Sequence, residues 1–184
     1  MHITAKVDHA VRTLLEITAS DQAVAVKAES IAAAQRIPPK VLESVLAELR
    51  RAGLVTSRRG PDGGYRLARP AAEISIADVI RALEGPLASV RGLRPEDVQY
   101  PGPAEPLQQV WIALRVNLRT VLENVSLADI AADGLPEFIG SLTADPGAWA
   151  RREPGAEGGP PHRPDPGKIL GRPGGADGSV RSSC

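Results

Sequence analysis

The stretch PKVLESVLAELRRAGLVTSRRGPDGGYRLAR, residues 39–69, decides the fold. Its first part has apolar residues at the three- and four-residue spacing of an amphipathic helix. A proline opens the helix, since proline is tolerated in a first helical turn, and Gly53 stops it. We therefore predict a helix over 39–52. Its buried stripe would consist of Val41, Leu42, Val45, Leu46 and Leu49, which leaves Lys40, Glu43, Ser44, Ala47, Glu48, Arg50 and Arg51 outward.

Two short β-prone runs follow the helix, at residues 54–59 and 65–69, around the turn GPDGG at 60–64. Short runs around a Gly- and Pro-rich turn are typical of a β-hairpin. The tip of this hairpin is basic, because Arg58 and Arg59 come directly before the turn.

Upstream, apolar periodicity predicts a helix over 3–19 and a short helix over 29–35, with Ile31 and Ala34 inward. Prolines at 38 and 39 separate the short helix from the next one. Helix, short helix, proline-led helix and hairpin is the order of a winged helix-turn-helix. We predict a mainly α fold with a small β-hairpin wing, in which residues 1–69 form the DNA-binding domain.

Downstream, a helix is predicted over 74–83, opened by Ser75 with Asp78 three positions later, which is close to a capping box. Residues 86–106 contain five prolines and read as an irregular connection. A long helix then carries more apolar surface than a monomer would cover, so we expect residues 70–133 to hold a linker and a dimerisation helix. The dimerisation residues would be Leu107, Val110, Trp111, Leu114, Leu118, Val121 and Leu122.

One more short helix is expected from Ser126 to about Ala132, and a tail at 144–184 completes the chain. Much of the chain's 18 Gly and 17 Pro falls in this tail. Such a composition buries too little apolar surface to offset the entropy lost on ordering, so we expect a disordered tail.

The charge is unevenly distributed, although the whole chain is formally neutral. Residues 1–69 carry 11 Lys and Arg against 7 Asp and Glu, a net charge of +4, whereas residues 70–143 carry 5 against 10, a net charge of −5. A basic module followed by an acidic one suits a nucleic-acid reader with a separate assembly region.

Several function classes are disfavoured by what the sequence lacks. The one cysteine is Cys184, and we find no phosphate loop of the form GxxxxGK[ST] and no pairing of a nucleophile with a base, so we expect neither an enzyme nor a cofactor. The first twenty residues lack the features of a secretory signal, and no 18-residue apolar run occurs. We expect a cytoplasmic protein without a membrane segment.

The expected partner is double-stranded DNA, because the major groove admits a helix and presents base-specific donors and acceptors. Lys40 would reach a guanine or a phosphate, Glu43 a cytosine amino group, Ser44 either kind of group, and Val41 a thymine methyl. Arg58 and Arg59 would enter the negative potential of the minor groove, and the glycines at 63 and 64 would allow close approach. These side chains also suit an ordinary solvated helix and turn, which stays open as an alternative.

Residues 42–87, together with ITAKVDHAVRTLLEIT at 3–18 and WIALRVNLRTVLENVSLADI at 111–130, resemble the Rrf-two (Rrf2) family of bacterial winged-helix regulators. The resemblance implies a homodimer in which two winged modules read a palindromic operator. It also implies major-groove contacts by Pro39, Lys40, Val41, Glu43 and Ser44, wing contacts by Arg59, Gly60, Pro61 and Gly63, and a position for Lys6 near phosphate. Asp62 departs from the glycine usual in that wing.

Many members of this family hold an iron-sulphur cluster through three closely spaced cysteines before the dimerisation helix. Residues 85–111 of this chain contain neither Cys nor His, so we predict a repressor without a cluster. Asp8 and His9 are adjacent on a helix and point to different faces, which favours structural roles over metal ligation. The alternative function is a winged-helix module for protein contact, or a partner-controlled regulator with little DNA specificity of its own.

Overall fold

The computed structural model describes residues 2–20, 24–60 and 62–150, and the chain divides into two compact units, residues 1–136 and 137–184. The first unit begins with α1 (Ala5–Ala19), α2 (Ala28–Gln35) and α3 (Pro39–Arg51). These are the three helices expected from periodicity, with ends shifted by one or two residues. The predicted inward position of Ala34 is wrong, because that residue is exposed.

The hairpin consists of β1 (Val55–Arg58) and β2 (Gly64–Leu67), paired antiparallel as predicted. Val26 adds one residue to the free side of β2: its N–H donates to the Tyr65 carbonyl at 2.9 Å, and the Tyr65 N–H donates back at 2.8 Å. Gly64 lies beside this bridge, and a Cβ on it would come within 2.5 Å of the Val26 carbonyl oxygen. Only glycine therefore fits where the hairpin joins the segment before α2.

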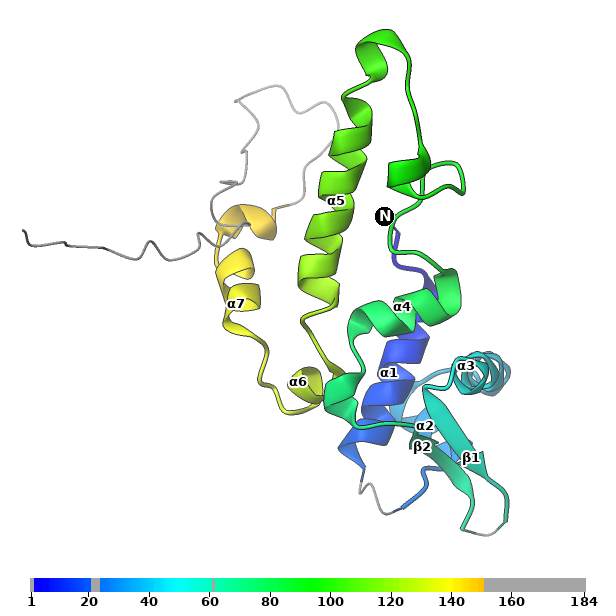
Figure 1. The fold of residues 1–184 in the computed structure, drawn as a ribbon. Helices are drawn as coiled ribbons and strands as arrows, with labels where there is room; N and C mark the ends of the chain where they lie inside the picture. Colours follow the sequence, from blue (N-terminus) through cyan, green and yellow to red (C-terminus); the bar gives the residue numbers. More distant parts are fainter. Residues whose placement is uncertain (1, 21–23, 61, 151–184) are drawn as a thin grey trace, which may run out of the picture. The chain divides into compact units, whose positions relative to one another are not determined.

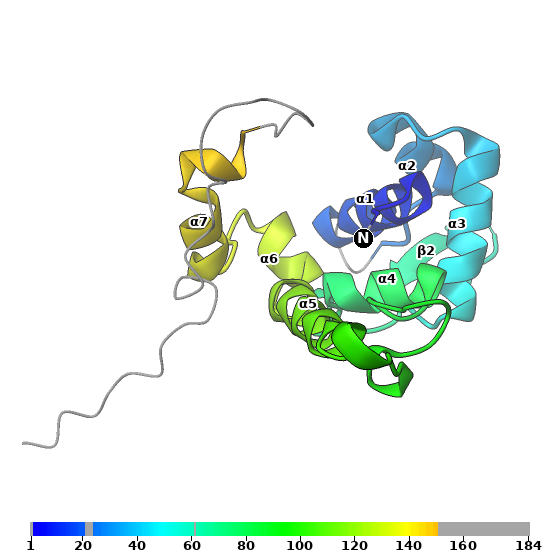
Figure 2. The same ribbon diagram turned by 90° about the horizontal axis from the view of Figure 1, so that it is seen from above.

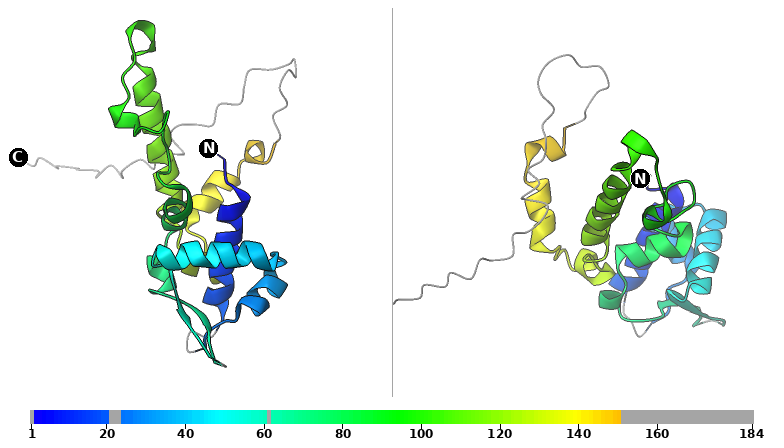
Figure 3. Two further views of the ribbon diagram at one scale, coloured as in Figure 1. Left: turned by 90° about the vertical axis from the view of Figure 1, so that its right-hand side faces the viewer. Right: turned by 45° about the horizontal axis from the view of Figure 1, so that its top comes forward.

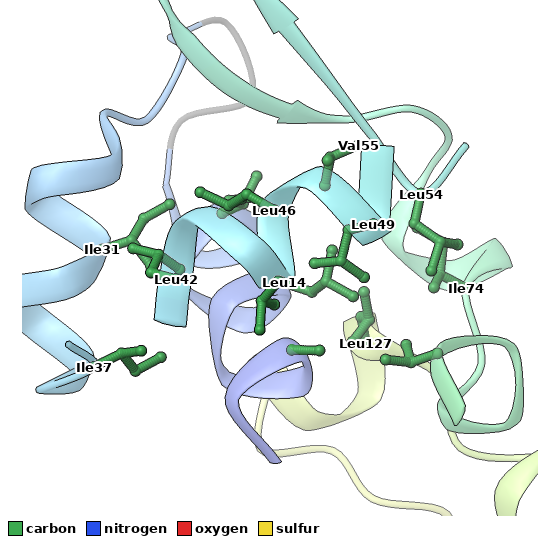
Figure 4. Close-up of a cluster of buried hydrophobic side chains, with 14 of the residues drawn as sticks. Leu14, Ile31, Ile37, Leu42, Leu46, Leu49, Leu54, Val55, Ile74 and Leu127 are labelled. Atoms are coloured by element: carbon green, nitrogen blue, oxygen red, sulfur yellow. The ribbon is translucent and has the colours of Figure 1, made fainter. Parts of the chain in front are cut away.

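The core of the first unit forms around α1, with α2 and α3 on one side of it and the short helix α6 (Leu127–Ala131) on the other (Figure 2). Figure 4 shows the buried side chains that α1, α3 and the hairpin bring together, among them Leu14, Leu46 and Val55. Ile74 and Leu127 are fully buried in the same cluster. The helices after residue 69 therefore complete the core of the winged module.

A backbone bridge closes this core. The Ile76 N–H donates to the Val125 carbonyl at 3.0 Å, and the Leu127 N–H donates to the Ile74 carbonyl at 2.9 Å. The bridge joins the start of α4 (Ile76–Glu84) to the start of α6. Both helices begin with a complete capping box, at Ser75 and at Ser126, which confirms the cap predicted for α4 and explains why so short a helix as α6 begins where it does.

The long helix α5 (Leu107–Leu122) and the connection before it extend together, at the opposite end of the unit from the hairpin (Figures 1 and 3). The connection contains two 3-10 turns, Pro95–Asp97 and Gly102–Ala104, and it packs on α5. The Trp111 indole N–H donates to the Tyr100 hydroxyl at 3.0 Å, and Arg115 pairs with Glu96. The expectation of an irregular connection did not include these contacts, because no periodic pattern in residues 86–106 indicates which residues of the long helix they meet.

The second unit, taken by itself, contains α7 (Glu137–Thr143) and a 3-10 turn at Pro146–Ala148. The Trp149 indole N–H donates to the Thr143 carbonyl at 2.7 Å. The predicted disordered tail begins at residue 144, so this turn falls within it; residues 151–184 of the predicted tail lie outside the described residues. Within the part of the chain that the structure describes, no helix combines the length and apolar character needed to cross a membrane.

Glu123, at the end of α5, gives a test of how α5 is held. Its carboxylate accepts from Arg81 on α4 and from Arg119 on α5, the latter at 3.0 Å, and these guanidinium groups, Arg81 foremost, lower the pKa of Glu123. A lowered pKa stabilises the fold above the ordinary glutamate pKa, and the stabilisation is lost as the pH falls through the lowered value. Glu123→Gln should therefore lower Tm by about 1 to 3 °C at pH 7, and the difference should vanish in acid.

Thermal unfolding followed by circular dichroism between pH 3 and pH 8 checks this expectation. Glu73→Gln is the matched control, because Glu73 is exposed and its side chain has no hydrogen bond or ion pair within the described residues. A deficit of Glu123→Gln that stays constant down to pH 3 contradicts the assignment.

Candidate nucleic-acid interface

The outward face of α3 is set by its buried face. Leu42, Val45, Leu46 and Leu49 are buried in the core, so the opposite side of the helix faces solvent. The five residues predicted to meet bases all lie exposed in the first two turns: Pro39, Lys40, Val41, Glu43 and Ser44. Val41 is 38% exposed, so its predicted place in the buried stripe is wrong and its methyl groups are free to make contacts.

The tip of the hairpin presents two cations. Arg58 ends β1, Arg59 follows it, and both side chains are exposed beside Gly60, which has a left-handed φ of 111°. Pro61, the next predicted contact, lies outside the described residues. The backbone turns back after these residues, so the wing presents its charge at the end of the hairpin.

Gly63 has a structural role inside the wing, which was the alternative left open by the sequence. Gly63 is buried, its N–H donates to the Gly60 carbonyl at 2.9 Å, and a Cβ on it would lie 2.4 Å from the Arg58 carbonyl oxygen. Glycine is therefore required by the turn itself. The prediction that this glycine allows close approach to DNA is therefore not needed to explain it, because the hairpin supplies a sufficient reason.

A cavity of about 700 Å³ opens between the wing, the start of α2 and the last turn of α3. Its lining includes Lys27, Arg50, Arg58 and Arg59, and Arg50 donates to the Ser57 hydroxyl at 3.4 Å. Lys27 and Arg50 were not among the predicted contacts. Their sequence positions give no signal, because only the fold of the hairpin over α2 and α3 brings them beside the wing arginines.

Ion pairing divides the basic residues of the first unit into two groups. On α1, α4 and α5, several are paired with carboxylates, as Arg12 is with Asp8 and Arg81 with Glu123. Between α2 and the wing tip, six basic side chains have no hydrogen bond or ion pair within the described residues: Lys27, Arg36, Lys40, Arg51, Arg58 and Arg59. Cations without a local counter-charge leave their field available to an anionic partner.

Lys6, predicted to lie near phosphate, makes three contacts within the protein. Its ammonium group lies 3.2 Å from the Glu48 carboxylate, 3.6 Å from the Glu84 carboxylate and 2.9 Å from the Leu83 carbonyl oxygen. It thus joins α1 to α3 and α4. Because two carboxylates already offset its charge, the geometry favours a role in orienting α3.

The residues before α5 do not fit an iron-sulphur cluster, which needs thiolate or imidazole ligands. The connection has no Cys or His, its Glu96 is engaged by its own backbone N–H and by Arg115, which together lower the pKa of Glu96, and its Tyr100 binds Trp111. Within the described ranges, no group of three or more His, Cys, Asp and Glu side chains could hold a metal ion. Asp8 pairs with Arg12, which leaves His9 without a neighbouring acidic ligand on α1.

The apolar residues of α5 occupy two adjacent faces. Trp111 contacts the connection, and Leu122 packs against the cluster of Val7 and Ile80. Val110 and Leu114, which lie one turn apart, are 54% and 41% exposed, and Leu107, Leu118 and Val121 are half-buried on the same side. No residue of α5 is buried, so the predicted dimerisation stripe is only partly covered by its own chain.

A helix-turn-helix followed by a basic hairpin defines the class of winged-helix DNA-binding transcriptional regulators. The chain belongs to the Rrf2 family: the family model described as "Rrf2: Iron-dependent Transcriptional regulator" matches residues 3–133. The resemblance seen in the sequence and the predicted fold class are both confirmed. Within the matched residues 3–133, this chain contains no cysteine.

Similar proteins of known name are regulators as well. A Mycobacterium tuberculosis protein, Rv1287, whose name describes a putative HTH-type transcriptional regulator, is 48% identical over 145 residues, covering 79% of this chain and 90% of its own. The HTH-type transcriptional regulator CymR of Bacillus subtilis is 33% identical over 132 residues, covering 72% of this chain and 91% of CymR. Both names describe transcriptional regulators of the helix-turn-helix type.

Solved structures of two regulators have a fold similar to that of this chain. The structure of CymR, the global cysteine regulator of B. subtilis, aligns with a TM-score of 0.62 and 31% identity, covering 72% of this chain and 98% of CymR. IscR of T. potens aligns with a TM-score of 0.59 and 30% identity, covering 73% and 89% of the two chains.

Proposed function

We propose that this protein is a sequence-specific transcriptional repressor that binds a palindromic operator as a homodimer and works without an iron-sulphur cluster. The observation that carries the proposal is the set of six unpaired cations between α2 and the wing tip, on a winged helix whose other basic residues are largely paired. Repression requires only that the bound protein blocks access to a promoter.

In the proposed complex, the first two turns of α3 enter the major groove. Lys40 contacts a guanine or phosphate, Glu43 accepts from a cytosine amino group, and Ser44 and Val41 complete the readout. The wing, with Arg58, Arg59, Gly60, Pro61 and Gly63, follows the minor groove, where the negative potential favours arginine. Lys27 and Arg50, in the cavity beside the wing, contact the phosphates between the two grooves.

The homodimer is supported by the exposed side of α5. Val110 and Leu114 leave apolar surface open to water, and a second copy of the same helix would remove it. A two-fold dimer presents its two α3 helices, the proposed recognition helices, in opposite directions. Its operator therefore has two inverted half-sites.

Selection of random DNA duplexes by the full-length chain tests the proposal. We expect enrichment of an inverted repeat whose half-sites are about one helical turn apart. Binding without sequence preference would replace the proposal by the alternative of a protein-contact module.

Arg59→Ala and Glu43→Ala should affect binding differently on the selected duplex. Loss of Arg59 should weaken binding to all duplexes and reduce the slope of log K against log salt by about 0.9 per wing, whereas loss of Glu43 should relax preference at one base pair, with discrimination of about 1 to 3 kcal/mol. Fluorescence anisotropy at several salt concentrations checks both. Arg94→Ala, an exposed arginine in the connection before α5, is the control; equal slopes for all three variants and the wild type contradict the docking.

Leu114→Asp should convert the dimer into a folded monomer, because a carboxylate would be desolvated in the apolar contact. Light scattering after gel filtration measures the mass, and affinity for the inverted repeat should fall about tenfold or more. Val116→Asp is the matched control on the opposite face of α5, where Val116 is 45% exposed. A dimer that survives Leu114→Asp but not Val116→Asp would place the interface on the other face.

Reconstitution with iron and sulfide should leave the purified protein colourless, since no thiolate lies before α5. Operator binding should be the same under air and under reducing anaerobic conditions. Visible absorption together with a loss of DNA affinity on oxidation would overturn the cluster-free assignment. A known cluster protein carried through the same procedure controls for the reconstitution.

A further inference from the structure

The turn between α2 and α3 contains a residue in an unusual backbone conformation. Arg36 has φ 53° and ψ 42°, which is the left-handed region. Its N–H donates to the Ala33 carbonyl at 3.4 Å, and the next N–H, of Ile37, donates to the Ala32 carbonyl at 3.0 Å. Ile37 is buried. This is the Schellman arrangement that ends helices, and it requires a left-handed backbone at residue 36.

This arrangement of hydrogen bonds does not require an arginine side chain. Glycine is the usual residue in a left-handed helix end, because a Cβ there crowds the following carbonyl oxygen. The hydrogen bonds of the turn come entirely from the backbone, and glycine would form all of them with less strain.

The side chain of Arg36 gives the backbone no compensating contact. It is exposed, and it has no hydrogen bond, ion pair or ring contact within the described residues. The left-handed backbone is accounted for by the two hydrogen bonds of the turn and by the burial of Ile37, but none of these contacts requires an arginine side chain. An exposed arginine at a position where glycine would form the same turn with less strain points to an external partner for the side chain.

The position of Arg36 indicates what that partner is. Arg36 lies three positions before Pro39, the first residue of α3, and the intervening Pro38 is exposed like Lys40 beyond it. A guanidinium next to the first turn of a helix in the major groove lies where the groove is edged by the sugar-phosphate backbone. Guanidinium and phosphate also match in geometry, since two parallel N–H groups can meet two phosphate oxygens.

We propose that Arg36 is a DNA-phosphate contact at the edge of the major groove, and that the turn gives up stability in exchange for this contact. The inference rests on the proposed DNA-binding function and adds a residue to it. The contact is independent of sequence, because phosphates are the same at every base pair.

The decisive variant is Arg36→Gly, for which stability and affinity should change in opposite directions. Relief of the left-handed strain should raise Tm by about 2 to 4 °C. Loss of the contact should weaken binding to the inverted repeat and to random duplexes alike, and should reduce the salt slope by about 0.9 per protomer. The measurements are thermal unfolding and anisotropy titrations of the full-length dimer.

Three controls separate charge from strain. Arg36→Lys keeps both the charge and the strained backbone, so Tm and salt slope should stay near the wild-type values. Arg36→Asn removes the charge with a residue that tolerates the left-handed region, and should reproduce the loss of slope. Asp133→Gly relieves the left-handed backbone at the end of α6, where φ is 51°, and should raise Tm without changing DNA affinity.

The outcomes distinguish this inference from the function beneath it. If Arg36→Gly and Arg36→Asn leave affinity and salt slope unchanged while Arg59→Ala reduces them, the Arg36 contact is wrong and the proposed function stands. A loss confined to one base pair would mean a base contact and would overturn the phosphate assignment, and a fall in Tm for Arg36→Gly would overturn the exchange of stability for affinity. If the wild-type chain selects no duplex at all, the proposed function fails together with the inference.

Discussion

The burial of one face of α3 is the constraint on which the rest of the interface depends. Leu42, Val45, Leu46 and Leu49 each remove apolar surface from water, at about 1.5 to 3 kcal/mol for a fully buried side chain of this kind. Rotating the helix about its axis would expose these apolar side chains to water, so the orientation of Lys40, Glu43 and Ser44 follows from core packing. The residues that would read DNA need no contacts of their own to be held outward.

The same core extends past the winged module and includes residues on both sides of the segment that contains α5. Ile74 and Leu127 are buried beside the α3 leucines, and the bridge between the starts of α4 and α6 fixes both ends of the segment that contains α5. Lys6 adds an electrostatic connection from α1 to α3 and α4. The proposed dimerisation surface and the recognition helix thus share one packed body, which would transmit the geometry of a dimer directly to the spacing of its two recognition helices.

Charge distribution along the chain has a different meaning once the fold is known. The net charge of residues 1–69 is only modestly positive, yet the side chains that lack a counter-charge gather between α2 and the wing. Glu48 and Glu84 form ion pairs with Lys6, and Asp8 forms an ion pair with Arg12. Local pairing therefore leaves these six cations on the proposed DNA-facing surface, which also presents the exposed carboxylates of Glu29 and Glu43.

The sequence by itself determined the helix order, the hairpin, the capping box at Ser75 and the exposed character of Lys40, Glu43, Arg58 and Arg59, because periodicity, glycine and proline act locally. It also determined that no cysteine precedes α5. Tertiary structure decided the rest: Val26 pairing with the hairpin, the internal role of Gly63, the contacts of Lys6, the packing of Trp111 on Tyr100 and the convergence of Lys27 and Arg50 on the wing. Each of these depends on residues distant in sequence that meet only after the core has formed, and no local pattern records which distant residues those are.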